Sequence, residues 1–173
     1  MNEATEAALQ DLADVLGVSL LSGGLVLATA ESCTGGWVAQ AVTAIAGSSA
    51  WFDRGFVTYS NEAKQELLGV PLATLETHGA VSGETAAAMV RGVLTHSRAD
   101  LAVSITGVAG PSGGSVAKPV GTVWFGFARR DGTVHTRKCL FAGDRKAIRA
   151  RAVDFALRAL RCLAEGQDLP SSG

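Results

Sequence analysis

A short run of small polar residues is the first place in this sequence where chemistry could occur. Residues 31–36 read Glu-Ser-Cys-Thr-Gly-Gly, between the apolar stretch 25–29 and a helix-like segment that begins at Trp37. Glycines let a backbone approach a ligand closely, and the N–H groups at a helix start can bind an anion or an oxyanion. Ser32 is therefore a candidate nucleophile, although a turn of Ser, Thr and Gly is equally common as a plain connection.

A nucleophilic serine needs a base, and the histidines are poor candidates for it. His78, His96 and His135 are all distant in sequence from Ser32, and the chain has no Gly-x-Ser-x-Gly motif. A Ser-His-Asp triad stays an alternative, because its members meet only in the folded protein. The other common activator is a lysine that burial or a nearby positive charge keeps neutral near pH 7.

Lys64 is the best placed of the four lysines. It lies one turn into a predicted helix over residues 61–68, which directly follows a predicted strand over residues 55–59. Tyr59 ends that strand, so the two side chains emerge at one strand end and helix start. The same pattern also fits a solvated Lys64 on a helix surface and a half-buried Tyr59 in the strand.

Helix and strand patterns alternate along the chain. Apolar residues at helical spacing predict helices over residues 4–21, 35–50, 61–68, 71–77, 82–98 and 144–164. Short apolar or β-branched runs predict strands over residues 25–29, 55–59 and 101–105, and Asp131-Gly132 predicts a hairpin between residues 121–128 and 134–141. We therefore expect a single three-layer α/β/α domain over residues 1–165, with a mixed, mainly parallel sheet, an antiparallel hairpin and a flexible tail at residues 166–173.

Two of the predicted strands end in similar residues. The first ends at Glu31 and Ser32, and the second ends at Thr106 and Gly107. Sites in open α/β sheets form beyond the carboxyl ends of strands, so we expect these two ends to form opposite walls of one site. Residues 110–119 contain three glycines and two prolines and are expected to form an irregular, mobile loop beside it.

Composition excludes several classes of protein. The net charge of −1 gives no overall attraction to nucleic acid or to an anionic membrane, and no apolar run is long enough for a membrane span. The first residues lack the basic start of a secretory signal. The three cysteines are scattered, and no metal-ligand spacing is present. These features predict a cytoplasmic globular protein with no metal, nucleic-acid or membrane partner.

Seven motifs, in order over residues 5–163, resemble the CinA carboxy-terminal domain family. They are AESCTGG (30–36), AGSSAWF (46–52), GFVTYSNEAK (55–64), HGAVS (78–82), TGVAGP (106–111), KPVGTVWF (118–125) and GDR (143–145). The resemblance implies a stand-alone amidase that hydrolyses nicotinamide mononucleotide to nicotinic acid mononucleotide and ammonia, a step of pyridine nucleotide salvage. It implies no cofactor and no metal.

Carried over by position, the resemblance puts the family's nucleophile at Ser32 and its lysine base at Lys64, with Tyr59 assisting them. The proton of Ser32 would pass to Lys64 as the serine attacks the carboxamide carbon, and an acyl-enzyme would follow. We expect the N–H groups of Gly35 and Gly36 to hold the oxyanion.

The remaining predicted site residues concern substrate binding. By resemblance, Thr106 and Arg145 line the substrate site, and Gly107 lies beside Thr106. Arg145 opens the last predicted helix, where its guanidinium and the helix N–H groups suit a phosphate. Thr34 and the helix start at Gly35 and Gly36 are the next candidates for that phosphate. Lys146 and Arg149 are expected on a solvated basic face.

Two other functions stay open at this level. A non-catalytic module that binds a pyridine nucleotide or a protein partner would bind ligand without releasing ammonia, and an amidase for another small carboxamide would prefer a different substrate. The apolar strands and Ala-rich helices are compatible with a homo-oligomer, but the sequence shows no specific interface.

Overall fold

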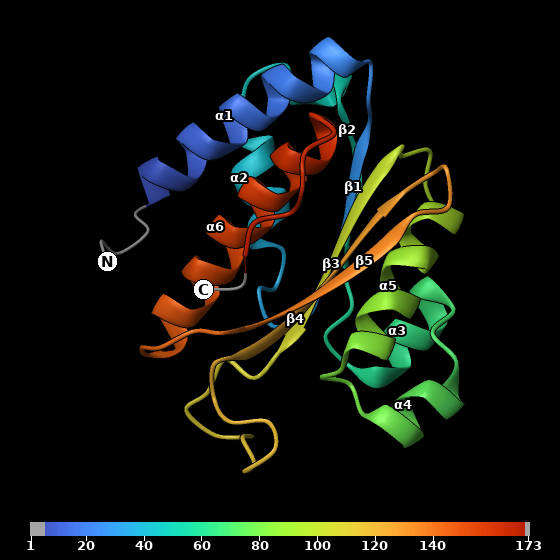
Figure 1. Ribbon diagram of the computed structural model, residues 1–173, viewed down its shortest axis with the longest axis vertical. Helices are drawn as coiled ribbons and strands as arrows, with labels where there is room; N and C mark the ends of the chain where they lie inside the picture. The colour runs from blue at the N-terminus through green and yellow to red at the C-terminus, as the bar shows by residue number, and fades with distance from the viewer. Residues whose placement is uncertain (1–5, 172–173) are drawn as a thin grey trace.

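A five-stranded mixed sheet forms the centre of the computed structural model, which describes residues 6–171 (Figure 1). Its strands are β1 (Leu27–Glu31), β2 (Phe52–Val57), β3 (Leu101–Gly107), β4 (Thr122–Arg129) and β5 (Val134–Leu140). In the order β2-β1-β3-β4-β5, β1 pairs in parallel with β2 and β3, whereas β4 is antiparallel to β3 and β5. The predicted hairpin is therefore present, and every strand except β4 runs in one direction.

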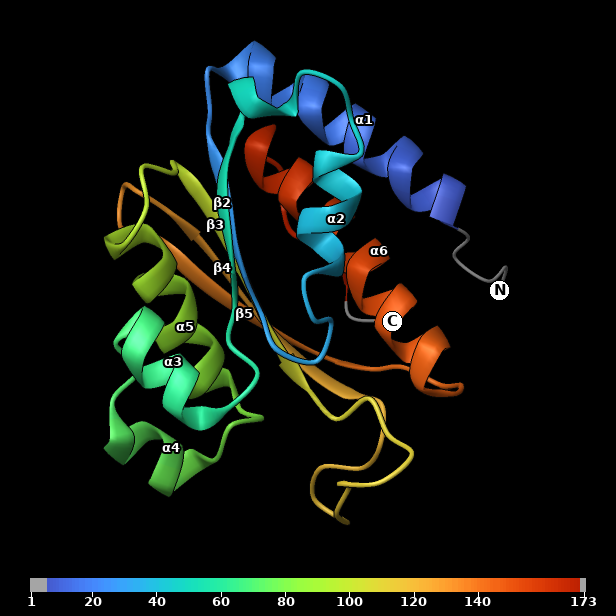
Figure 2. The ribbon, with the colours of Figure 1, turned by 180° about the vertical axis from the view of Figure 1, so that it is seen from behind.

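Helices cover both faces of this sheet, as Figures 1 and 2 show from opposite sides. The helices are α1 (Glu6–Gly23), α2 (Trp37–Thr43), α3 (Asn61–Leu68), α4 (Leu72–His78), α5 (Gly83–Thr95) and α6 (Arg145–Ala164). Helices α1, α2 and α6 lie on one face, and α3, α4 and α5 lie on the other. The predicted three-layer α/β/α architecture is confirmed.

Alternating residues of β3 pack into two separate cores. Leu101, Val103 and Ile105 belong to the core beneath α1 and α6, and all three are fully buried. Ala102 belongs to the core beneath α5, and the hydroxyl of Ser104 donates to the Ala86 carbonyl of that helix over 2.6 Å. Because successive side chains of a strand point to opposite faces, one continuous apolar strand supplies both layers.

Several element boundaries differ from the sequence prediction. The predicted helix over residues 35–50 is wrong in length, because α2 ends at Thr43 and a separate 3-10 turn follows at Ser48–Ala50. Gly47, at φ 82, takes the left-handed conformation directly before this 3-10 turn, so the segment cannot continue as one helix to residue 50. The predicted strand over residues 55–59 begins and ends earlier, as Phe52–Val57, and the predicted strand over residues 25–29 lies later, as Leu27–Glu31.

Other local predictions are confirmed. Helix α3 has the predicted bounds, and the side chains of Ser82 and Asp144 cap α5 and α6 by accepting from Thr85 N and Ala147 N. The segment between β3 and β4 contains no helix or strand. Residues 166–171 continue beyond α6 without regular structure, and residues 1–5 and 172–173, which the predictions included, lie outside the described residues. None of the described helices is long and apolar enough to cross a membrane.

Candidate active site

The carboxyl ends of β1 and β3 lie side by side, because these strands are direct neighbours in the sheet. Glu31 is paired with Ile105, and the next residue, Ser32, donates its backbone N–H to the Ile105 carbonyl over 2.9 Å. Thr106 and Gly107 continue β3 beyond this point. The two strand ends that the sequence singled out therefore meet at one place.

Lys64 contacts Ser32 at this point. Its Nζ donates to Ser32 Oγ over 3.2 Å and to the Thr58 carbonyl over 2.9 Å, and the Ser60 carbonyl lies 3.5 Å away. Ser60 caps α3 by accepting from Ala63 N, which starts the helix so that Lys64 falls in its first turn. The side chain thus runs back from the helix to the ends of β1 and β2.

The surroundings of Lys64 favour its neutral form. The residue is only 1% exposed, and its burial lowers the pKa of the ammonium below the usual value. Within residues 6–171 no carboxylate lies within ion-pair distance of it. A neutral amine can donate its two N–H groups to the Thr58 and Ser60 carbonyls and direct its lone pair at the Ser32 hydroxyl. The arrangement can therefore take a proton from Ser32.

Cys33, the neighbour of Ser32, is not suited to be the nucleophile. Burial raises the pKa of its thiol to about 12, so the thiolate that would attack is absent near neutral pH. Ser32, by contrast, carries a hydroxyl that contacts the Lys64 amine, and both residues line a small cavity.

A small cavity of about 210 Å³ opens onto the Ser32 and Lys64 pair. Of the predicted site residues, its lining includes Ser32, Tyr59, Lys64, Thr106, Gly107 and Arg145. Five further lining residues were not proposed from the sequence: Cys33, Asn61, Ala80, Val81 and Ala109. All five fall within the motifs that carry the family resemblance, so membership of a motif was the signal available for them.

Thr34, Gly35 and Gly36 do not line this cavity, which differs from the prediction. The N–H of Gly36 donates to Glu31 Oε2 over 3.1 Å, and that of Gly35 donates to the Ser32 carbonyl over 3.0 Å. Because both groups already have acceptors, the expectation that they hold an oxyanion is not supported. Within residues 6–171 the buried Thr34 hydroxyl has no hydrogen-bond partner.

The fully buried carboxylate of Glu31 occupies the start of α2 instead. Besides Gly36, it accepts from Val38 N over 3.1 Å through Oε2 and from Ala39 N over 2.9 Å through Oε1. A carboxylate at a helix N-terminus is favoured by the unpaired N–H groups and the helix dipole. Glu31 therefore fixes the turn that carries Ser32, a role that the sequence analysis missed.

The hydrogen bonds of the Glu31 carboxylate give a prediction about stability. Glu31→Gln replaces one acceptor oxygen by an NH₂ group that faces N–H donors, so we expect the free energy of unfolding to fall by about 1–3 kcal/mol. Urea denaturation measures the loss. Glu62→Gln changes an exposed acid on α3 in the same way and should alter stability by less than about 0.5 kcal/mol. Equal stability of the two variants would show that the Glu31 carboxylate does not stabilise this turn.

Tyr59 and Arg145 contact each other across the cavity mouth. Arg145 Nη2 donates to the Tyr59 hydroxyl over 2.9 Å, and Arg145 Nη1 donates to the Gly110 carbonyl over 2.8 Å. Tyr59 is 62% exposed, and no hydrogen bond joins its hydroxyl to Ser32 or Lys64. Tyr59 thus acts on the position of Arg145 rather than directly on the Ser32 and Lys64 pair. Thr106 donates to the Ala80 carbonyl over 2.7 Å and joins the two walls of the cavity.

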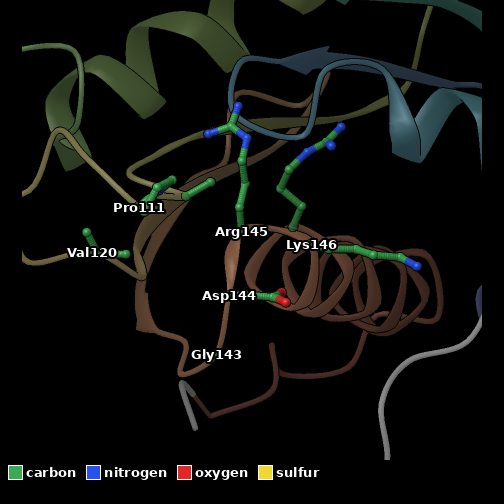
Figure 3. Close-up of a pocket in the computed structure, with 8 residues that line it drawn as sticks. Pro111, Val120, Gly143, Asp144, Arg145 and Lys146 are labelled. Atoms are coloured by element: carbon green, nitrogen blue, oxygen red, sulfur yellow. The ribbon is translucent and has the colours of Figure 1, made fainter.

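A second, larger cavity of about 790 Å³ adjoins the first (Figure 3). It shares Ala109 and Arg145 with the small cavity, and its other lining residues are Pro111, Val120, Gly143, Asp144, Lys146 and Arg149. Arg145 therefore lies between the small cavity that Ser32 and Lys64 line and a larger one at the start of α6.

Arg149 does not lie on a solvated face as predicted. Its Nε donates to the Cys33 carbonyl over 3.0 Å, its Nη2 donates to the Thr34 carbonyl over 2.8 Å, and its guanidinium carbon lies 5.4 Å from the centre of the Trp37 ring. Helical spacing alone could not show that this side of α6 packs against the Ser32 turn. Lys146 is exposed, as expected.

The described residues offer no metal centre of the usual kind. Within residues 6–171, no group of three or more His, Cys, Asp or Glu side chains is arranged to hold a metal ion. None of the three histidines lines the small cavity.

Comparison with known proteins assigns this chain to a family. The CinA C-terminal domain matches residues 9–164, and the chain belongs to that family. A nicotinamide-nucleotide amidohydrolase PncC from Enterobacter agglomerans is 58% identical over 154 residues, which cover 89% of this chain and 94% of that protein. The protein of the same name from Escherichia coli K12 is 55% identical over 156 residues, covering 90% and 94%.

A solved structure has the same fold over most of its length. The crystal structure of the competence/damage inducible protein CihA from Agrobacterium tumefaciens superposes with a TM-score of 0.87 at 48% sequence identity. The match covers 90% of this chain and 94% of that one.

Proposed function

We propose that this protein is a nicotinamide-nucleotide amidase, which hydrolyses nicotinamide mononucleotide to nicotinic acid mononucleotide and ammonia as a step of pyridine nucleotide salvage. Relatives that carry this activity in their names are 58% and 55% identical to the chain over most of its length. The observation that carries the mechanism is the 3.2 Å contact between a buried lysine amine and a serine hydroxyl inside a cavity.

In the first half of the reaction, Ser32 is the nucleophile and Lys64 is the general base. The Ser32 proton passes to the neutral Lys64 Nζ while Oγ bonds to the carboxamide carbon, which gives a tetrahedral oxyanion. As the intermediate collapses, the C–N bond breaks and the Lys64 ammonium returns its proton to the leaving nitrogen. Ammonia departs, and the acid part of the substrate remains as an ester on Ser32.

In the second half, water replaces ammonia. Lys64, neutral again, takes a proton from a water molecule that attacks the ester carbon, and then returns it to Ser32 Oγ as the ester bond breaks. One amide and one water thus give one acid and one ammonia, with no change in oxidation state. The protein needs no metal or organic cofactor for these steps.

The oxyanion requires a donor other than Gly35 and Gly36. Cys33 N–H belongs to the residue directly after the nucleophile, the position that supplies this donor in many serine hydrolases. Cys33 lines the small cavity, and its N–H makes no hydrogen bond to an oxygen of the described residues. We assign the oxyanion to this N–H.

The two cavities suit the two parts of the substrate. The small cavity, about 210 Å³, accommodates the pyridine ring with its carboxamide at Ser32. The ribose and phosphate extend past Arg145 into the larger cavity, where the lining is basic. A substrate that fills both cavities places its reacting carbon and its charged end at opposite sides of Arg145.

Ammonia release from three related compounds tests the function. We expect purified protein to release ammonia from nicotinamide mononucleotide much faster than from nicotinamide riboside or nicotinamide. Binding of the nucleotide without ammonia release would mean a non-catalytic nucleotide-binding module. Preference for an unphosphorylated carboxamide would mean an amidase with another substrate.

The rate should depend on pH through Lys64. Because burial lowers the pKa of Lys64, its neutral form persists to pH values well below the usual lysine pKa of 10.5. We expect kcat/KM to fall on the acid side, as Lys64 becomes protonated, and to reach its plateau well below pH 10.5. A pH profile of kcat/KM measures this limb, and a rate that kept rising up to pH 10.5 would contradict the role of Lys64 as base.

A further inference from the structure

Two arginines of α6 lie at the larger cavity without an acidic partner. Arg145 and Arg149 are one helical turn apart and both line this cavity. Within residues 6–171 neither guanidinium forms an ion pair, whereas Arg158 and Arg161 of the same helix are each paired with an acid at 2.8 Å. Like charges at this spacing repel each other, so an anion in the cavity between them would be stabilised by both.

The other charged residues of this cavity are arranged differently. Asp144 Oδ1 accepts from Ala147 N over 2.8 Å as the helix cap, and Figure 3 shows its side chain directed away from Arg145. Lys146 also extends in a different direction from Arg145 in that view. Arg145 and Arg149 are thus the two charged groups that can act together on one ligand.

Arg149 also holds the turn that carries the nucleophile. Its two hydrogen bonds end on the carbonyls of Cys33 and Thr34, the first two residues after Ser32. Neither bond uses Nη1, and within residues 6–171 no hydrogen bond of Nη1 is present, so the N–H groups of that nitrogen remain for a ligand of the cavity that Arg149 lines. One guanidinium can therefore contact an anion on one side and the Ser32 turn on the other.

We propose that Arg149 is a specificity-determining residue, which binds the phosphate of the substrate and couples that binding to the position of Ser32. This inference rests on the proposed function. A guanidinium suits a phosphate because it offers several charge-assisted N–H donors in one plane. Binding energy at the remote phosphate then holds the nucleophile turn in its reactive position, so it raises kcat as well as lowering KM.

Arg149→Lys tests the coupling, because lysine keeps the charge and cannot contact the phosphate and both carbonyls together. We expect the ratio of kcat/KM for nicotinamide mononucleotide over nicotinamide riboside to fall about ten- to a hundredfold, with part of the loss in kcat. Arg158→Lys is the matched control on the same helix, outside both cavities, and should leave the ratio unchanged. An unchanged ratio in Arg149→Lys would overturn the proposal.

Binding of inorganic phosphate gives a readout that needs no turnover. Isothermal titration of wild type, Arg149→Lys and Arg158→Lys should show weaker phosphate binding in the Arg149 variant alone, and equal binding in all three would overturn the phosphate site. If the wild type released no ammonia but bound phosphate through Arg149, the proposed function would fail and the phosphate site would stand. Arg149→Gln serves as the second variant should Arg149→Lys melt at a clearly lower temperature than the wild type.

Discussion

We expect replacement of Ser32 by alanine to remove ammonia release from nicotinamide mononucleotide and to leave the folded protein able to bind the nucleotide. The expected loss in kcat is at least about three orders of magnitude, because alanine lacks the hydroxyl that Lys64 contacts and on which the acyl-enzyme would form. The fold should persist, since Lys64 keeps its contact with the Thr58 carbonyl and the Ser32 backbone keeps its bond to Ile105. Initial rates and nucleotide binding, measured on the same preparation, check both parts.

Ser104→Ala is the matched control for this variant. Ser104 is a fully buried serine of β3 whose hydroxyl donates to the Ala86 carbonyl, and it lies outside the small cavity. Its loss should lower stability by about 1 kcal/mol and leave kcat close to that of the wild type. Activity of Ser32→Ala within a few fold of the wild type would remove Ser32 as the nucleophile.

Lys64→Met should lose activity nearly as completely. Methionine matches the length of the lysine stem but cannot accept a proton, so we expect the rate to fall by about two to four orders of magnitude. Lys64→Arg should fall as far, because a guanidinium stays protonated. Lys138→Met, at an exposed position of β5, is the control and should keep its activity. Substantial activity in both Lys64 variants would show that Lys64 is not the general base and has a structural role only.

Lys64→Met should also change how the free energy of unfolding depends on pH. Lys64 has a lowered pKa in the folded state, so its burial destabilises the wild type as pH falls from the unfolded-state pKa, near 10.5, toward the folded-state pKa. As pH falls through that window, the free energy of unfolding of Lys64→Met should therefore rise relative to that of the wild type. Denaturant titrations at several pH values measure the difference, and a gap that stayed constant with pH would show that Lys64 is not held neutral by the fold.

Much of this architecture could be predicted because the signals are local. Helix α3 is specified by the Ser60 cap and by Gly69, which ends it in a left-handed conformation, so its bounds were predicted correctly. The alternation of helix and strand patterns was enough for the α/β class. By contrast, the bounds of β2 depend on its pairing with β1, a long-range contact that the sequence pattern of β2 does not contain.

The site was predicted only in part, for the same physical reason. Motif and family resemblance selected Ser32 and Lys64, but the burial of Lys64 depends on the packing of α3 beside the ends of β1 and β2. The positions of Glu31 and Arg149 were known, but their contacts could not be predicted, because both side chains bind backbone groups. A side chain that binds backbone leaves no complementary residue in the sequence, so periodicity and charge patterns cannot reveal it.

The most direct test of Ser32 as the nucleophile of the proposed amidase is a balance of products from nicotinamide mononucleotide, with wild type and Ser32→Ala side by side. This role of Ser32 predicts one ammonia and one nicotinic acid mononucleotide for each substrate molecule consumed by the wild type, and neither product from the variant. Product formation by Ser32→Ala at a rate similar to that of the wild type, or substrate loss without ammonia, would contradict it.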